Sequence, residues 1–416
     1  MFRSLSILPL AVLMAIPAAA QMDDDPSRGP SVSVDALVAE ALARSPDLAA
    51  ARSRQTAARE MERPAAALAD PTVEPLVQMA DFPNYTIGTE DMSMAGVQVS
   101  QPLPYPGKRR ARAETARAET AQRESEAVDL ERRIAREVRS LYARLYAVDQ
   151  EQKTLEAGRE LADLLAATAK ARYSSGGGEQ ESLLKAQLQG TRLEEQLEDH
   201  HAERRAIVAQ LNRWLDRPGD SPVGPATSLP DVTTPSTAPS TPAESTRVRM
   251  ARAAVATAER RLASARLDLK PDFTPSAGLA TRGPRGPVLM VNVEIELPFW
   301  KREKQEPRIR AAEAELESAR QELRAAEAET RAEVARLASE RGRAERQIVR
   351  YREGIVPQSS ATFDAARASY LAGRGDFSNL IEDFNLWLEA RVQLARREAD
   401  RYTAWAGLEA LTGGLP

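Results

Sequence analysis

The chain has 416 residues, of which 42% are hydrophobic, 28% are charged and only 5% are aromatic. Its formal net charge is −4, so the overall charge gives no sign of a nucleic-acid partner. It contains no cysteine, which excludes disulfides, thiolate metal sites and cysteine nucleophiles, and we expect no lipid anchor on an N-terminal cysteine. Long stretches rich in alanine, arginine, glutamate and leucine are typical of extended helices.

Residues 1–20 are predicted to be a secretory signal peptide. Arg3 gives a positive start, residues 7–16 form an apolar segment, and three alanines precede the expected cleavage site before Gln21. The alternative is a buried N-terminal helix. Residues 21–32 are polar and predict a flexible N-terminus. No later apolar run approaches the roughly 20 residues of a membrane-spanning helix, so a membrane-crossing part would have to consist of strands.

The chain carries an internal duplication, a feature to seek before any local pattern. The segment 97–105 aligns with 291–299, which lies 194 residues later (291 − 97). A Tyr-x-x-Gly motif that begins at Tyr173 recurs at Tyr370, 197 residues later (370 − 173). In each copy we expect a short helix, a strand pair, a very long helix, a turn and a second long helix.

The duplication sets the expected organisation of the chain. We expect the first copy over 33–217 and the second over 246–413. Residues 218–245 between them are rich in proline, serine and threonine and predict an extended linker, either wrapped on the surface or disordered. The fold class expected from this order is mainly α with a small β part.

The two strand pairs are expected at about 71–103 and about 272–298. In the second pair, apolar residues at 289, 291, 293, 295 and 297 alternate with Asn292, Glu294 and Glu296. A period of two suits a half-buried soluble sheet, and it equally suits a barrel wall with lipid outside and water inside. Two strand pairs between very long helices leave open sheet edges, which only oligomerisation would close.

The segments after the strand pairs predict very long helices. Residues 108–172 contain no proline, and residues 308–371 contain none before Pro357. At about 1.5 Å per residue, roughly 65 residues make a rod of about 100 Å. Residues 179–215 and 377–412 are predicted to return as helices, so that each copy forms an antiparallel helical hairpin.

No group of residues predicts catalysis or a cofactor. The two histidines, His200 and His201, are adjacent and point to different faces of a helix, so we expect solvated surface side chains. No phosphate loop, nucleophile elbow or His-x-x-x-His pair occurs. Three methionines near the first strand pair, Met79, Met92 and Met94, are candidate ligands for Cu(I) or Ag(I), and the alternative is lipid-facing or loop positions.

With these residues laid out, the chain resembles the TolC-like outer-membrane efflux family from about Ser33 to Gly413. The duplication, the Leu-Pro-Tyr-Pro-Gly-Lys corner that ends at Lys108, and the two Tyr-x-x-Gly turns carry the resemblance. The corner is most similar to that of the heavy-metal branch, the CzcC- and CusC-like proteins, which use Pro-Trp-Pro-Gly-Lys. Members of that branch often carry a lipidated cysteine, and this chain departs from them there.

The resemblance implies a fold and partners. Three chains would form a twelve-strand transmembrane β-barrel in the outer membrane and an α-helical tunnel through the periplasm. The resemblance implies a homotrimer, a periplasmic adaptor protein, an inner-membrane pump of the RND type and outer-membrane lipid as partners. The polar strand face would line the lumen of the barrel, with Gln98, Ser100, Asn292 and Glu294.

The resemblance also implies sites at the helical tips, about 173–183 and about 370–380. The expected adaptor-docking residues are Tyr173, Ser174, Gly176, Leu183, Tyr370, Gly373, Arg374 and Leu380. A tip constriction is expected from Asp376, Asn379, Glu382 and Asp383, because threefold symmetry would turn each carboxylate into a ring that attracts cations. The family's acidic tip positions correspond to Asn379 and Glu382, so one of them is an amide here. The alternative is that these are ordinary solvated charges at a helix start.

These expectations together predict a passive exit duct for metal cations in the outer membrane. One alternative is an export duct for drugs or other small molecules. The other is a periplasmic coiled-coil adaptor or structural protein, because adaptors also contain helical hairpins.

Overall fold

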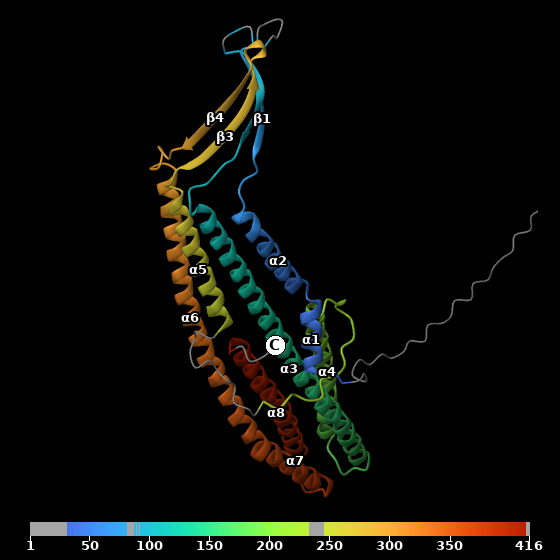
Figure 1. The fold of residues 1–416 in the computed structure, drawn as a ribbon. Coiled ribbons are helices and arrows are strands. Elements are labelled where there is room, and N and C mark those ends of the chain that lie inside the picture. The colour runs from blue at the N-terminus through green and yellow to red at the C-terminus, as the bar shows by residue number, and fades with distance from the viewer. Residues whose placement is uncertain (1–30, 81–86, 89, 91, 233–244, 413–416) are drawn as a thin grey trace, which may run out of the picture.

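The computed structural model describes residues 31–80, 87–88, 90, 92–232 and 245–412. The molecule is elongated, with a β-sheet at one end and long helices that run from the sheet to the opposite end (Figure 1). The predicted signal peptide 1–20 and nearly all of the predicted flexible segment 21–32 lie outside the described residues.

Two short helices open the described chain, α1 (Val34–Arg44) and α2 (Pro46–Ala66). The hydroxyl of Ser33 accepts a hydrogen bond from the backbone N–H of Ala36, at 3.2 Å. The hydroxyl of Ser45 accepts one from Leu48 in the same way, and Pro46 occupies the first helical position, where its missing N–H costs nothing. Serine caps therefore start both helices.

The four strands form one antiparallel sheet in chain order: β1 (Thr72–Gln78), β2 (Met94–Ser100), β3 (Asp272–Thr281) and β4 (Pro287–Glu296). A short 3₁₀ turn (Gly283–Arg285) lies between β3 and β4. Pairing of β2 with β3 joins the first copy of the duplicated unit to the second. Within the described chain, the outer edges of β1 and β4 have no strand partner.

The strand register sorts side chains onto two unlike faces. Val99 and Val291 both pair with Ala277, and with Val97, Leu279, Leu289, Val293 and Ile295 they form the apolar face. Ser100 and Asn292 both pair with Ser276, and with Thr72, Glu74, Gln98, Glu294 and Glu296 they form the polar face. The period of two expected from sequence is therefore present in the sheet.

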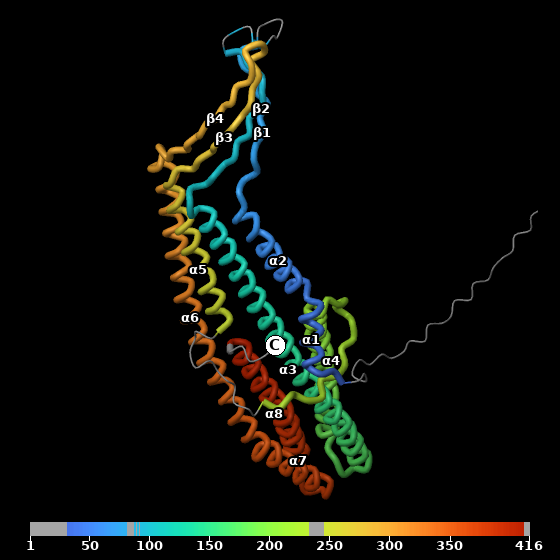
Figure 2. The backbone as a smooth tube through the Cα atoms, viewed as in Figure 1, coloured from blue at the N-terminus to red at the C-terminus, as the bar shows by residue number. Residues whose placement is uncertain are grey.

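Long helices make up the rest of the molecule: α3 (Lys108–Ser174), α4 (Gln180–Trp214), α5 (Thr246–Leu267), α6 (Gln305–Arg350), α7 (Val356–Leu371) and α8 (Phe377–Thr412). The hairpins α3–α4 and α7–α8 end far from the sheet (Figure 2). In the part of the chain that the structure describes, no helix is both long and apolar enough to cross a membrane.

The second rod is interrupted, whereas the sequence predicted it as continuous. A π-helical turn (Tyr351–Ile355) separates α6 from α7, and the whole stretch 305–371 matches the 67 residues of α3 in length. Pro357 has no N–H to donate, and its ring clashes with the carbonyl four residues earlier in a regular α-helix. The wider π turn before it relieves both problems.

The main hydrophobic core lies where α1, α3, α4 and α8 meet, around the buried side chains of Leu145 and Leu211. The described part of the proline-rich linker, residues 218–232, belongs to this core through Val223, Ala226 and Val232. A second core, farther from the sheet, packs the α3–α4 hairpin against the α7–α8 hairpin. The linker therefore wraps the molecule near its middle as far as the structure describes it.

Buried ion pairs reinforce this middle region. The carboxylate of Asp149 on α3 lies 2.8 Å from the guanidinium of Arg204 on α4, and both residues are buried. Asp149 also accepts the backbone N–H of Ala226 at 2.7 Å, and Arg204 donates to the carbonyl of Val223 at 3.0 Å. This group of four residues fastens the linker to the first helical hairpin.

A second buried carboxylate joins the two hairpins. Glu151 on α3 accepts two hydrogen bonds from Arg396 on α8, at 2.7 and 2.8 Å. The imidazole Nε2 of His200 lies 3.6 Å from the same carboxylate, and its side chain is only 13% exposed. The expectation that His200 is a solvated surface residue is therefore wrong, because the helical hairpin turns it toward Glu151.

Candidate functional site

Both helical tips end in the same backbone structure. Gly176 and Gly373 have positive φ angles of 74° and 76°. The N–H of each glycine donates to the carbonyl of the tyrosine three residues earlier, and the N–H of the following residue donates to the carbonyl of the residue before the tyrosine. This pair of bonds is a Schellman helix end, which places a glycine in the left-handed region. The repeated Tyr-x-x-Gly motif thus encodes two equivalent turns.

The side chains at the two tips are not equivalent. Tyr173 is 45% exposed, whereas Tyr370 is 4% exposed and stacks edge-on against Phe377. The guanidinium of Arg172 lies 4.7 Å from the centre of the Tyr370 ring and donates to the Tyr370 carbonyl at 2.7 Å. Arg172 therefore links the first tip to the second, a role that the sequence analysis missed.

Burial corrects part of the expected docking set. Leu380 is 0% exposed and Tyr370 is almost as buried, so neither side chain offers a surface to a partner, and both position the second turn from inside. Leu183 is partly buried against the same core. The remaining expected docking residues are exposed at the tips: Tyr173, Ser174, Gly176, Gly373 and Arg374.

The expected constriction residues lie just before α8 and in its first two turns, on the side away from the buried side chains of the helix. Asp376, Asn379 and Glu382 are exposed and Asp383 is half-buried. Phe377, Leu380 and Phe384, on the other side of the helix, are buried in the second core at the spacing of an apolar helix face. The structure thus presents these polar residues together near the second tip.

One basic residue, Lys185, lies beside this acidic group. Lys185 on α4 bonds to Ser378 at 2.7 Å, and its ammonium lies 2.6 Å from Glu181. The hydrogen bond to Glu181 raises the pKa of Lys185, and the negative charge of Asp376 adds to the shift. Lys185 also lines a groove of about 450 Å³ between α4 and α8, together with Glu382. The negative charge of the carboxylates at this tip is therefore partly balanced by Lys185 of the same chain.

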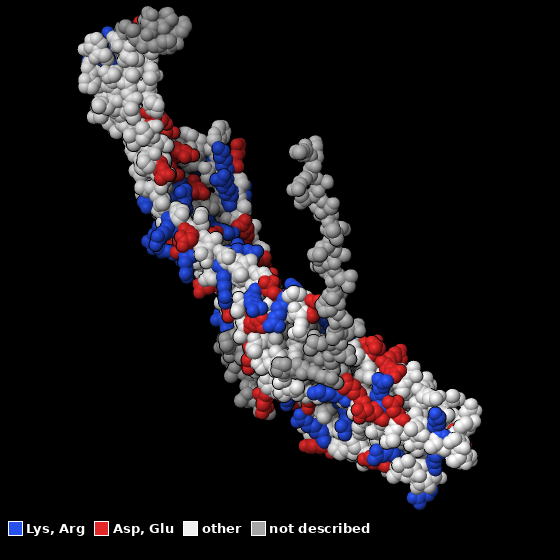
Figure 3. All heavy atoms as spheres, turned by 90° about the vertical axis from the view of Figure 1, so that its right-hand side faces the viewer, with Lys and Arg blue, Asp and Glu red and all other residues white. Residues whose placement is uncertain are grey.

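The residues expected to line a lumen lie on one side of the sheet. Gln98, Ser100, Asn292 and Glu294 all belong to the polar face, where Ser100 hydrogen-bonds across to Thr72 at 2.6 Å. The opposite, apolar face is exposed; Leu289 and Val291, for example, are 71% and 68% exposed. On the side of the molecule drawn in Figure 3, the described part of the sheet shows few charged side chains, in contrast to the helices.

The three methionines near the first strand pair have different surroundings. Met79, with a φ of 48°, and Met92 are 59% and 53% exposed, whereas Met94 is buried at 8%. Among the described residues, no group of three or more His, Cys, Asp or Glu side chains is arranged to hold a metal ion. The structure gives no interaction that joins the three thioethers.

A buried lysine fastens the sheet to the helices. Lys108, 6% exposed, lies 2.8 Å from the carboxylate of Asp272 and donates to the carbonyl of Lys270. Asp272 also accepts the backbone N–H of Tyr105 at 2.7 Å. The corner of the first copy thus holds the start of the second strand pair. In the second corner, the rings of Phe299 and Trp300 remain 81% and 66% exposed.

Solved outer-membrane channels share this fold. VceC from Vibrio cholerae matches with a TM-score of 0.77 and 18% identity, over 91% of this chain and 96% of that one. The outer-membrane channel OprN matches with a TM-score of 0.79 and 18% identity, over 92% and 90%. CusC matches with a TM-score of 0.71 and 16% identity, over 90% and 91%. No curated protein matches the chain.

A family model described as "Outer membrane efflux protein" matches the sequence in two segments, residues 37–215 and residues 240–414. The two matched segments correspond to the two copies of the duplicated unit. Together they span most of the chain, including both helical hairpins and both strand pairs. The chain therefore belongs to the outer membrane efflux protein family.

Proposed function

We propose that the chain forms a homotrimeric, passive exit duct that carries metal cations across the outer membrane. Proteins of this family are outer-membrane channels and not enzymes, and they work with adaptor and inner-membrane pump components in tripartite efflux. In the proposed assembly the pump is of the RND type and supplies the energy. The duct moves its cargo without changing it chemically.

The observation that carries this proposal is the open, two-faced sheet. Its apolar face is exposed over the length of the strands, and its polar face carries Gln98, Asn292 and Glu294. Three chains with four strands each would give a closed barrel of twelve strands, in which β4 of one chain pairs with β1 of the next. Closure would pair the free backbone N–H and C=O groups at the edges of β1 and β4. It would also turn the apolar face toward lipid and enclose a water-filled lumen.

The helices support the periplasmic half of the proposal. The two hairpins of each chain would form a tunnel, and the exposed tip residues Tyr173, Ser174 and Arg374 would meet the adaptor. Asp376, Asn379, Glu382 and Asp383 would surround the entrance in three copies. Fixed carboxylates favour cations in a narrow pore, although Lys185 reduces the net charge there.

The choice of metal cations rests on the first corner and on the acidic tip. The Pro-Tyr-Pro-Gly-Lys corner at 104–108 is similar to that of the heavy-metal branch. CusC is one of the structures that share the fold. Met79 and Met92 are exposed and would be available to soft cations such as Cu(I) near the outer end of the barrel.

Fractionation tests the duct. A heat-resistant trimer in the outer membrane is the expected result, whereas a monomer in the soluble periplasm would favour the adaptor or structural alternative.

The cargo is tested by deleting the gene. Loss of tolerance to copper, silver, zinc or cobalt, restored by the wild-type gene, supports metal export. Sensitivity to drugs with unchanged metal tolerance would assign the duct to small molecules.

A further inference from the structure

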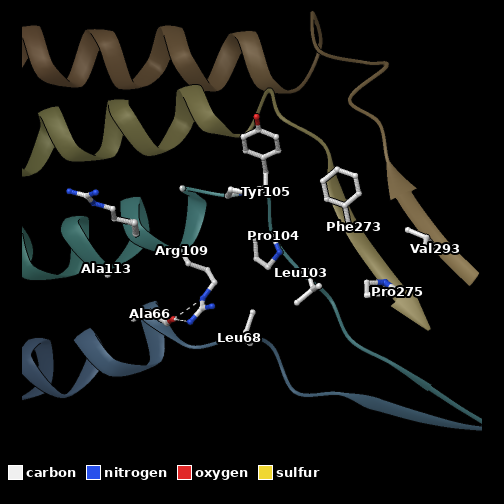
Figure 4. Close-up of a pocket in the computed structure, with 13 residues that line it drawn as sticks. Ala66, Leu68, Leu103, Pro104, Tyr105, Arg109, Ala113, Phe273, Pro275 and Val293 are labelled. Atoms are coloured by element: carbon white, nitrogen blue, oxygen red, sulfur yellow. Dashed lines mark hydrogen bonds between the residues drawn. The ribbon is translucent and has the colours of Figure 1, made fainter. Parts of the chain in front are cut away.

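An apolar pocket of about 850 Å³ lies where the sheet meets the helices. Its lining comes from the end of α2, the first corner and strands β3 and β4: Leu68, Leu103, Pro104, Phe273, Pro275 and Val293 (Figure 4). This volume falls within the roughly 300–1,000 Å³ of pockets that enclose small ligands. The pocket contains no residue of the proposed lumen or tips.

The pocket opens on the apolar side of the sheet. Phe273 pairs with Ile295, and Pro275 pairs with Val293, which is 59% exposed on the apolar face. Leu103 forms an isolated bridge with Phe273 and so lies on the same side. An apolar chain that lies along the strands can therefore continue into the pocket without leaving an apolar surface.

Positive charge lies at the helical rim of the pocket. Arg109 donates through Nε and Nη2 to the carbonyl of Ala66, at 3.0 and 2.9 Å (Figure 4). A carbonyl holds the guanidinium in place without neutralising its charge. Arg110, the next pocket residue, pairs with Glu114, which in turn also binds Arg260. The rim therefore keeps a net positive charge beside the apolar lining.

We propose that this pocket binds an anionic glycerophospholipid of the periplasmic leaflet, with an acyl chain in the pocket and the phosphate at Arg109 and Arg110. The inference rests on the proposed function, which places the apolar face in the outer membrane and the helices in the periplasm. At the helical end of the sheet, the adjacent leaflet is the periplasmic one. Arginine is well suited to phosphate because its planar guanidinium donates several hydrogen bonds.

The lining favours a lipid over a second strand or peptide. Pro104 and Pro106 have no backbone N–H, and β3 at Pro275 is already paired with β4, so an added strand would lack donors along this part of the pocket. An acyl chain requires no hydrogen bonds and gains from burial of apolar area. The pairing of an apolar pocket with a cationic rim matches the two chemical parts of a phospholipid.

Native mass spectrometry of the purified, delipidated full-length protein tests the site with phosphatidylglycerol and with diacylglycerol of the same chains. We expect phosphatidylglycerol to bind and diacylglycerol to bind more weakly. Arg109→Gln should weaken phosphatidylglycerol binding about fivefold, the effect of one basic residue near anionic lipid. Arg109→Lys should retain binding because the charge remains, although the paired bonds to Ala66 are lost.

Two further variants separate the site from general surface charge. Leu68→Trp should fill the pocket and prevent binding, whereas Arg123→Gln should leave binding unchanged. Arg123 is an exposed arginine of α3 that pairs with Glu126 outside the pocket, which makes it a matched control. Trimer resistance to heat, measured on each variant, reports folding separately.

Three results would overturn the lipid site. One is equal phosphatidylglycerol binding by wild type, Arg109→Gln and Leu68→Trp, and another is equal binding of diacylglycerol. The third is a crosslink from a photoreactive residue at position 68 to a neighbouring copy or to the N-terminal segment. The binding assay uses purified protein and fractionation uses cells, so failure of the site and failure of the proposed duct are separate results.

Discussion

The Asp149–Arg204 ion pair gives a quantitative test of how the linker is held. Replacing Asp149 with leucine leaves Arg204, 7% exposed in its side chain, as a buried charge without its carboxylate. Loss of one partner of a buried pair costs about 3–5 kcal/mol. The same change removes the acceptor of the Ala226 N–H, and an unsatisfied buried donor adds about 1–3 kcal/mol.

The double variant Asp149→Leu/Arg204→Met separates these two costs. It contains no unpaired buried charge, because an apolar pair of similar size replaces the ion pair at little cost. Two losses remain, the acceptor of the Ala226 N–H and the Arg204 donor to the Val223 carbonyl. We expect the double variant to lose about 1–3 kcal/mol for each unsatisfied group, less than the single variant, which also keeps an unpaired buried charge.

The assay measures the urea concentration at which the purified trimer dissociates, and the rate of protease cleavage within 218–232 is a second readout. The single variant should dissociate at lower urea and be cleaved faster than the double variant. If both variants are equally destabilised, the unpaired charge of Arg204 is not the main cause of the lost stability. If neither changes the cleavage rate, this ion pair does not fasten the linker.

Four other substitutions probe the sheet, the tips and the core. Val291→Arg places a charge on the apolar face, which costs roughly 2–4 kcal/mol in lipid, so the amount of trimer in the outer membrane should fall. Asn292→Arg places the same charge on the polar face, so the trimer should remain and its cation conductance in planar bilayers should decrease. Gly373→Ala introduces a side chain at a φ of 76°, and its Cβ would lie 3.0 Å from Nη2 of Arg172. The second tip should therefore be strained, and metal tolerance should decrease. Burial raises the pKa of Tyr402 from 10.0 to about 12. The stability that comes from this shift is fully present below pH 10 and is lost as the pH rises toward 12. Tyr402→Phe has no group to ionise, so it should lose less stability over this pH range.

Each change has a control or a contradicting result. Equal trimer levels for the two arginine variants would mean that the sheet faces do not differ in environment. Gly176→Ala has open space around its Cβ, so it should reduce efflux less than Gly373→Ala. If Gly176→Ala reduces efflux more, the contact with Arg172 is not the cause of the effect at position 373. An alkaline unfolding curve that is identical for wild type and Tyr402→Phe would exclude Tyr402 as a source of the pH dependence.

Features set by local periodicity could be predicted from the sequence. The alternation at 289–297 identified the two faces of β4, and the seam of Phe377, Leu380 and Phe384 is buried. The same is true of the serine caps before α1 and α2. Each depends on residues a few positions apart, so the pattern is visible without the tertiary structure.

Contacts between distant parts of the chain could not be predicted in this way. Arg172 binds the carbonyl of Tyr370, which lies 198 residues away, and Glu151 binds Arg396, 245 residues away. In the sequence these are single charges among many on long helices. The exposure of Tyr173 and the burial of Tyr370 also separate two positions that the repeat made equivalent, because only the second tip receives Arg172 and Phe377.

Single-cysteine labelling of the two sheet faces tests most directly whether the sheet is a membrane wall around a water-filled lumen. The chain has no cysteine, so Val291→Cys and Asn292→Cys each introduce one thiol at adjacent positions. In proteoliposomes, a polar maleimide should label Asn292→Cys rapidly and leave Val291→Cys nearly unlabelled, because lipid excludes the reagent. Equal labelling of the two positions would contradict the proposed duct.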